Sequence, residues 1–277
     1  MSITIISSGE VVTSSILGAE DEQYVYLGGT ANITIINSSG QQYVSSGGTA
    51  NSTTINAGGV QDIYLGGEVD YTTLNGGLQN IFDGGSASGT LLNTGGIQSV
   101  FSGGSANDTI ISSGGTQTVS SGGAASGATV YSGGYVFVSG GGIVDNTTVS
   151  TGGYITVFSG GMANNNTISS GGYMRVMEET SVSGIIQEDG AAFLGDTFAT
   201  VLNGSNANGT FYISNGIASN IIGKVDVRST NTAIDTTVLR GMTVGSLGNA
   251  IRTTINSGGS LFLFGTTIDT SINSGGI

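Results

Sequence analysis

Apolar residues recur at fixed positions between pairs of glycines along most of this chain. Short segments such as residues 97–104 (IQSVFSGG) alternate with longer segments such as residues 105–115 (SANDTIISSGG). Successive glycine pairs end at Gly104, Gly115 and Gly123, so the steps are eleven and eight residues, and a single step of ten separates Gly67 from Gly77. The sequence therefore contains a 19-residue repeat, built from a short arm and a long arm.

Both arms keep apolar residues in constant columns. The fourth position of the short arm is always β-branched: Val25, Val44, Ile63, Ile81, Val100, Val119, Val138 and Val157. The seventh position of the long arm is always aliphatic: Ile36, Ile55, Leu74, Leu92, Ile111, Val130, Val149 and Ile168. Because the arms are short and end in glycine, this alternation predicts strands and not helices. So short a strand buries its apolar face only when it stacks on its copy from the next repeat.

The pattern predicts an all-β fold, a single-stranded parallel β-helix (β-solenoid). We expect it to be right-handed, as crossovers between parallel strands usually are, with about 19 residues per coil and about 14 coils. Residues 1–177 form the regular part. Residues 178–277 are first irregular and then repeat every 17 residues, from positions 232, 249 and 266, and we expect them to continue the same solenoid. A disordered linker is the rival interpretation, but a linker has no reason to keep aliphatic residues in fixed columns.

Two polar columns are expected to face inward. The second position of the short arm is glutamine six times, and then Val136 and Ile155: Gln23, Gln42, Gln61, Gln79, Gln98 and Gln117. An amide ladder, in which each side chain bonds its copies above and below, is the favoured interpretation over a row of ligand donors. Threonines at the fifth position of the long arm share the parity of the aliphatic residues, and this argues against an exposed ice-binding array.

Aromatic residues occupy the fifth position of several short arms, opposite in parity to the buried valines. They are Tyr26, Tyr64, Phe82, Phe101 and Phe158. Strand alternation points these rings outward, where they could bind a sugar or another protein or form an association surface. Alternatively, the adjacent turn tucks them over the corner of the coil. The sequence leaves both open.

Composition limits the chemistry that the chain can perform. The formal net charge is −13, and all five basic residues lie after position 174, so we expect no nucleic acid partner and no insertion into a membrane. Histidine and cysteine are absent, so we expect no catalytic triad, no metal site, no cofactor and no enzyme. The alternative is a carbohydrate-active β-helix enzyme that uses carboxylates near residues 178–196. Acidic runs stand at Glu20-Asp21-Glu22, Glu178-Glu179 and Glu188-Asp189, and each is more simply a solvated surface.

The stretch IQSVFSGGSANDTIISSGGTQTVSSGGAASGATVYSGG resembles the AIDA-type repeats of self-associating autotransporter adhesins, over residues 22–172 and more loosely over 232–276. The resemblance implies a non-catalytic stalk outside the bacterial cell, either outer-membrane-associated or secreted. The stalk would mediate self-association or attachment, with other copies of itself and a host or neighbouring cell as partners. It also implies a glycosyltransferase that adds heptose to serine or threonine. Carried over by motif, the candidate acceptors are the serines before glycine pairs: Ser46, Ser102, Ser113, Ser121, Ser132, Ser159 and Ser170.

Overall fold

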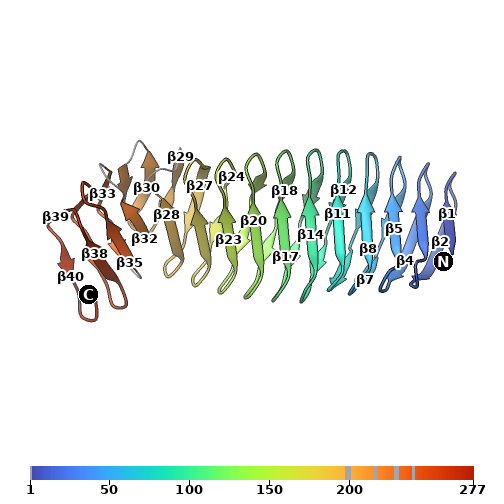
Figure 1. Ribbon diagram of the computed structural model, residues 1–277, viewed down its shortest axis with the longest axis horizontal. Coiled ribbons are helices and arrows are strands. Elements are labelled where there is room, and N and C mark those ends of the chain that lie inside the picture. The colour runs from blue at the N-terminus through green and yellow to red at the C-terminus, as the bar shows by residue number, and fades with distance from the viewer. Residues whose placement is uncertain (1, 197–200, 215–216, 228–230, 239–240) are drawn as a thin grey trace. The chain divides into compact units, whose positions relative to one another are not determined.

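The computed structural model describes residues 2–196, 201–214, 217–227, 231–238 and 241–277 (Figure 1). The described residues form strands and turns, and none of them belongs to a helix that could cross a membrane. The strands stack as a parallel β-solenoid of about 13 turns, close to the fourteen expected. The chain divides into two compact units, Met1–Thr147 and Thr148–Ile277.

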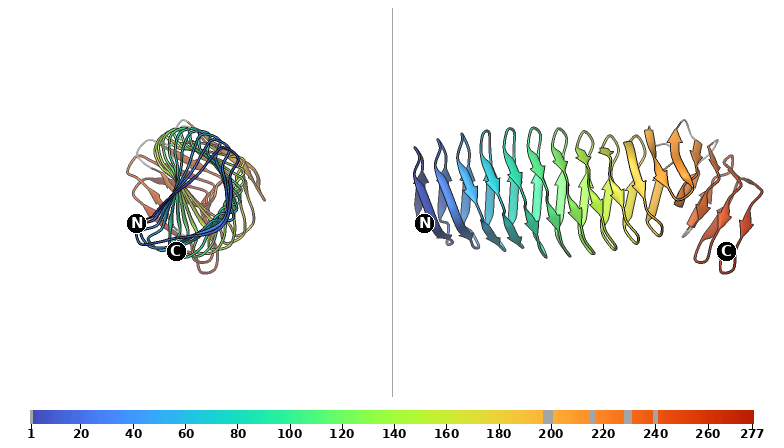
Figure 2. Two further views of the ribbon diagram at one scale, coloured as in Figure 1. Left: turned by 90° about the vertical axis from the view of Figure 1, so that its right-hand side faces the viewer. Right: turned by 180° about the vertical axis from the view of Figure 1, so that it is seen from behind.

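In the first unit, every short arm is one strand of a parallel sheet, here called sheet A. Its strands are β1 (Ile3–Ile6), β3 (Glu22–Val25), β5 (Gln41–Val44), β8 (Val60–Ile63), β11 (Leu78–Ile81), β14 (Ile97–Val100), β17 (Thr116–Val119) and β20 (Tyr135–Val138). Equivalent positions of neighbouring repeats pair directly, as Val25 does with Val44 and Val44 with Ile63. Strands of successive coils lie side by side in the blue-to-green part of Figure 2.

The long arms form the second sheet, here called sheet B. Its first two strands are β2 (Val11–Leu17) and β4 (Thr30–Ile36). Later long arms are split in two: β6 (Thr49–Asn51) and β7 (Thr54–Asn56), β9 (Glu68–Asp70) and β10 (Thr73–Asn75), β12 (Ser86–Ser88) and β13 (Leu91–Leu92), β15 (Ser105–Asn107) and β16 (Ile110–Ile111), β18 (Ala124–Ser126) and β19 (Thr129–Val130), then β21 (Ile143–Asp145). The columns predicted from the sequence face inward in both sheets. Their β-branched and aliphatic side chains are fully buried, as Val44 and Ile55 are.

The long arms have a kink at their fourth position, which the sequence did not predict, and most of them are split into two strands there. The residue there has a positive φ in coil after coil, for example Ile33 (φ 56°), Tyr71 (56°), Asp108 (53°) and Asn165 (54°). Asparagine, aspartate and glycine tolerate this left-handed conformation, and they fill most of the column. Each coil therefore turns at three points, namely the two glycine corners and this kink.

The two glycines of a corner are required for different reasons. Gly47 has φ +81°, which other residues adopt only at a cost. Gly48 does not have a positive φ, but a Cβ atom there would lie 2.2 Å from the carbonyl oxygen of Val25 in the preceding coil. The first glycine therefore provides the left-handed turn, and the second lets neighbouring coils approach closely.

The second unit begins with the same two-sheet pattern. Its strands in sheet A are β23 (Tyr154–Val157), β26 (Tyr173–Val176), β28 (Ala192–Asp196), β32 (Ile222–Val227), β34 (Thr237–Val238), β35 (Gly241–Val244), β37 (Thr254–Ile255), β38 (Ser260–Leu263) and β40 (Ser271–Ile272). Those in sheet B are β22 (Thr148–Val149), β24 (Met162–Asn164), β25 (Thr167–Ile168), β27 (Ser181–Gln187), β29 (Val201–Asn206), β30 (Gly209–Ser214), β31 (Ile217–Ser219), β33 (Thr232–Ile234), β36 (Asn249–Ile251) and β39 (Thr266–Ile268).

A hairpin interrupts the parallel ladder of the second unit. Strand β29 pairs in parallel with β27, but the chain then reverses and β30 pairs antiparallel with both β29 and β31. The reversal occurs at a tight turn in which the Asn206 carboxamide oxygen accepts a hydrogen bond from the backbone N–H of Asn208 (2.9 Å), before Gly209 at φ +106°. The hairpin lies in the part of the chain that the sequence marks as irregular. The parallel pairing then resumes with a 17-residue step, in which Ala233, Ala250 and Thr267 are in register.

Candidate functional site

The glutamine column forms a continuous buried ladder. Each carboxamide nitrogen donates to the carboxamide oxygen of the preceding coil, from Gln42 to Gln23 (2.6 Å) and onward to the bond from Gln117 to Gln98 (2.7 Å). All six side chains are fully buried. The geometry confirms the amide ladder over a ligand-binding row, because none of these six side chains reaches the surface.

The threonine column lies against the glutamine ladder and completes it. Thr34 donates its hydroxyl to Gln23 (3.3 Å), and Thr109 donates to Gln98 (3.0 Å). The inward orientation expected from parity is confirmed, since Thr34 and Thr109 are 1% exposed. The ladder ends at Gln117, whose carboxamide oxygen has no hydrogen-bond partner. In earlier coils the carboxamide oxygen accepts from a threonine of the long arm and from the glutamine of the next coil. At these two positions the chain has Ala128 and Val136, which have no donor.

The aromatic column faces outward and its rings stack on one another. Tyr64 and Phe82 have ring centroids 4.9 Å apart, and Phe82 and Phe101 5.0 Å, with the rings almost parallel. Tyr64, Phe101 and Phe158 are 36–40% exposed, and Tyr26 and Phe82 are half-buried. Stacking covers both faces of Phe82 and one face each of Tyr64 and Phe101.

All seven candidate acceptor serines are exposed. Ser46, Ser102, Ser121 and Ser159 lie at the corner that follows the short arm. Ser113, Ser132 and Ser170 lie at the corner that follows the long arm. The hydroxyls of several lie directly over the first corner glycine of the next coil: a Cβ added to Gly122 would be 2.6 Å from Ser102 Oγ, and one added to Gly133 would be 2.8 Å from Ser113 Oγ.

The acidic runs lie apart from one another. Glu178-Glu179 precede β27 and Glu188-Asp189 follow it, so the two exposed pairs are at opposite ends of one strand. Glu179 accepts a hydrogen bond from Ser159 Oγ (3.1 Å). The side chain of Asp196 lies outside the described residues. Pairs placed at different corners do not face one another across a groove as glycosidase carboxylates do, which favours the non-catalytic interpretation.

The third acidic run is tied to the start of the chain. Asp21 accepts hydrogen bonds from the hydroxyl of Ser2 (2.8 Å) and from the backbone N–H groups of Ser2 (2.7 Å) and Gly18 (3.2 Å). These bonds, that of the Ser2 hydroxyl above all, lower the pKa of Asp21. Among the described residues, no group of three or more His, Cys, Asp or Glu side chains is placed to hold a metal ion.

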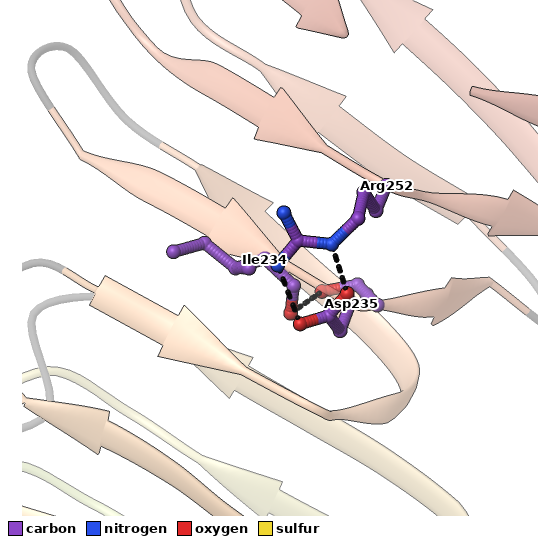
Figure 3. A network of polar contacts seen from close by, with 4 residues as sticks. Ile234, Asp235 and Arg252 are labelled. Carbon is purple, nitrogen blue, oxygen red and sulfur yellow. Dashed lines mark hydrogen bonds and ion pairs between the residues drawn. The ribbon is translucent and has the colours of Figure 1, made fainter. Parts of the chain in front are cut away.

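A charged pair occupies the kink column of the second unit. The guanidinium of Arg252 faces the carboxylate of Asp235 in the preceding coil, with contacts of 2.6 Å from Nε and 2.8 Å from Nη2 (Figure 3). The hydrogen bonds and charge of Arg252 lower the pKa of Asp235. Sequence reasoning missed this pair because the kink column itself was not recognised.

Comparisons with known proteins agree with this geometry. The AIDA family, described as "Adhesin of bacterial autotransporter system, probable stalk", matches residues 81–134. The chain is also similar to a solved structure, the crystal structure of a TibA fragment that was hyper-glycosylated by TibC. The two sequences are 37% identical, and the two structures superpose with a TM-score of 0.65. That match covers 99% of this chain and 89% of the TibA chain. A search of curated proteins gave no significant match. The chain belongs to the AIDA-type stalk family of bacterial autotransporter adhesins.

Proposed function

We propose that this region of an adhesin stalk is a glycosylated, self-associating segment at the bacterial surface and has no catalytic activity of its own. In this proposal a glycosyltransferase modifies the corner serines, and the outer face of the coils contacts other copies or a host cell. The observation that carries the proposal is the placement of all seven serines at exposed corners. The TibA fragment, glycosylated through TibC, supports a glycosyltransferase as partner.

The corners give a transferase access that the strands do not. Serines such as Ser102 and Ser121 occupy the same corner of adjacent coils, and adjacent strands are about 4.8 Å apart. A Cβ atom on the first corner glycine of the next coil would lie within 3 Å of the serine hydroxyl, as at Gly122 and Gly133. Glycine at this position therefore leaves room for the hydroxyl itself, which stays exposed at the corner.

Co-expression with a heptosyltransferase of this adhesin family, followed by intact-mass and peptide mass spectrometry, tests glycosylation. We expect mass increments of whole sugar units that map to the corner peptides. A variant with Ser102, Ser113, Ser121 and Ser132 changed to alanine should lose up to four increments. The matched control replaces the half-buried strand serines Ser86, Ser88, Ser99 and Ser105 with alanine, and it should lose none. Sugar that maps to the strands, or no added mass, would contradict the acceptor assignment.

A further inference from the structure

The second unit has a groove on the outer face of sheet A that the stalk role does not explain. It is lined by Tyr154, Ile155, Thr156, Tyr173, Arg175 and Leu194. These residues come from β23, β26 and β28, in which Tyr154, Tyr173 and Ala192 form one row and Thr156, Arg175 and Leu194 the other. The groove therefore crosses three neighbouring strands, and side chains form both of its walls.

The first wall is aromatic. The rings of Tyr154 and Tyr173 are stacked, with centroids 4.8 Å apart and an angle of 12° between their planes. The next residue in this row is Ala192, so no further ring follows Tyr173 in the row. A flat apolar surface beside this small side chain can accommodate one face of a ring-shaped ligand.

The second wall carries a cation. Arg175 is exposed, and it is the first basic residue of the chain. It lies two positions after Tyr173 on the same strand, so both side chains project from the same face. A guanidinium group binds carboxylates through two parallel hydrogen bonds. None of the residues that line the groove is acidic, although the whole chain has a charge of −13.

We infer that this groove binds a saccharide that carries a carboxylate, such as a uronic acid unit of an acidic polysaccharide. Such a sugar presents a C–H face and a carboxylate on one rigid ring, which matches the neighbouring Tyr173 and Arg175. An extended peptide is a poorer match, because it would add to a sheet through unpaired backbone groups and the backbone of β26 is already paired on both sides. This ligand would extend the proposed adhesin function from contact between copies to recognition of a glycan.

The inference rests only on this groove, so it can fail while the stalk and glycosylation proposals stand. The test uses purified full chain, tri-galacturonate as the acidic probe and galactotriose as the neutral probe, with calorimetry and NMR of the tyrosine resonances. We expect tri-galacturonate to bind and galactotriose to bind at least about 10-fold more weakly, since a charge-assisted hydrogen bond is lost. Added salt should weaken the acidic ligand only.

Variants identify the residues. Arg175→Gln should weaken binding of tri-galacturonate about 10-fold or more, Tyr173→Ser several-fold, and Arg175→Lys less than Arg175→Gln. Arg252→Gln, which removes an arginine of the same unit outside the groove, should leave binding unchanged. Equal binding of the two probes, no binding, or an unaffected Arg175→Gln variant would overturn the inference. If Arg175→Gln instead weakens self-association while no sugar binds, the groove is a contact between copies.

Discussion

Individual polar side chains in the core show how the solenoid tolerates buried amides. A buried carboxamide without partners costs about 1–3 kcal/mol, whereas a hydrogen-bonded one is close to neutral or stabilising. Gln79 lies within the ladder: it donates to Gln61, and it accepts from Gln98 (2.7 Å) and from the hydroxyl of Thr90 (3.2 Å). Gln117 lies at the end, where it donates to Gln98 and Thr109 but its own oxygen is unsatisfied.

Position in the ladder should therefore decide the effect of one substitution. We expect Gln79→Val to lower the free energy of unfolding by about 2–4 kcal/mol, because it leaves several partners without a bond. Gln117→Val should change it by less than about 1 kcal/mol, since Val136 already follows in the column and an unsatisfied oxygen is removed. Chemical denaturation of both variants measures the difference. Equal losses would show that the ladder does not act as a network.

Residue Ile33 should be a point of local strain. It is β-branched, 52% exposed and held at φ 56°, a conformation that costs such residues about 1–2 kcal/mol. Ile33→Asn should raise the free energy of unfolding by about 1 kcal/mol, because asparagine tolerates the kink. The reciprocal control, Asp108→Ile at the same position of another coil, should lower it by a similar amount. A destabilised Ile33→Asn variant would contradict this account.

At the scale of elements, the inward columns could be predicted from the sequence because strand alternation and a constant period determine which side chains stack. The kink could not be predicted so directly, because Ile33 and Tyr71 obscure a column that is otherwise rich in Asn, Asp and Gly. The β29–β30 hairpin has no second copy in the chain with which to align it. The groove beside Arg175 depends on side chains from three strands, so no single arm shows it.

The Asp235–Arg252 pair joins two neighbouring kinks, and its contribution should depend on pH. The pKa of Asp235 is lower in the folded chain than in the unfolded one, so the pair stabilises the fold above the unfolded pKa of about 3.9. That stabilisation is lost as the pH falls through the folded pKa. Arg252→Gln should raise the pKa of Asp235 toward its usual value, and the melting temperatures of parent and variant should differ less at pH 3 than at pH 7. Both side chains are about half exposed, so the difference is expected to be small.

Carbon-detected NMR titration of the aspartate carboxylates measures the pKa directly. The pKa of Asp21, lowered chiefly by the hydroxyl of Ser2, serves as the internal control and should not change in Arg252→Gln. An Asp235 pKa that stays low in the variant would show that Arg252 is not the cause of the shift.

For the whole molecule, charge opposes the association that the proposed function requires. Residues 1–174 contain no lysine or arginine, and copies that approach side by side repel one another. An association surface must therefore supply apolar contact, and the aromatic run Tyr64–Phe82–Phe101 is the candidate in the first unit. Because the faces of these rings cover one another, a partner would meet mainly their exposed edges. Association through this run should strengthen as salt screens the charge.

Replacing Tyr64, Phe82 and Phe101 with serine, the residue already present at Ser45 and Ser120 in this column, should weaken aggregation of cells that display the protein. The loss of two stacked pairs costs about 0.5–1.5 kcal/mol each, so melting curves must first show that the variant remains folded. The matched control replaces three exposed rings elsewhere, Tyr71, Tyr131 and Tyr212, with serine and should aggregate like the parent. If copies associate side by side, aggregation of the parent should also increase when the salt concentration is raised from about 20 mM to about 150 mM. At the higher concentration the Debye length falls below about 10 Å, so the repulsion between copies is screened. If the folded Tyr64/Phe82/Phe101 variant aggregates as strongly as the control, the aromatic run only stabilises the coil and association occurs on another surface.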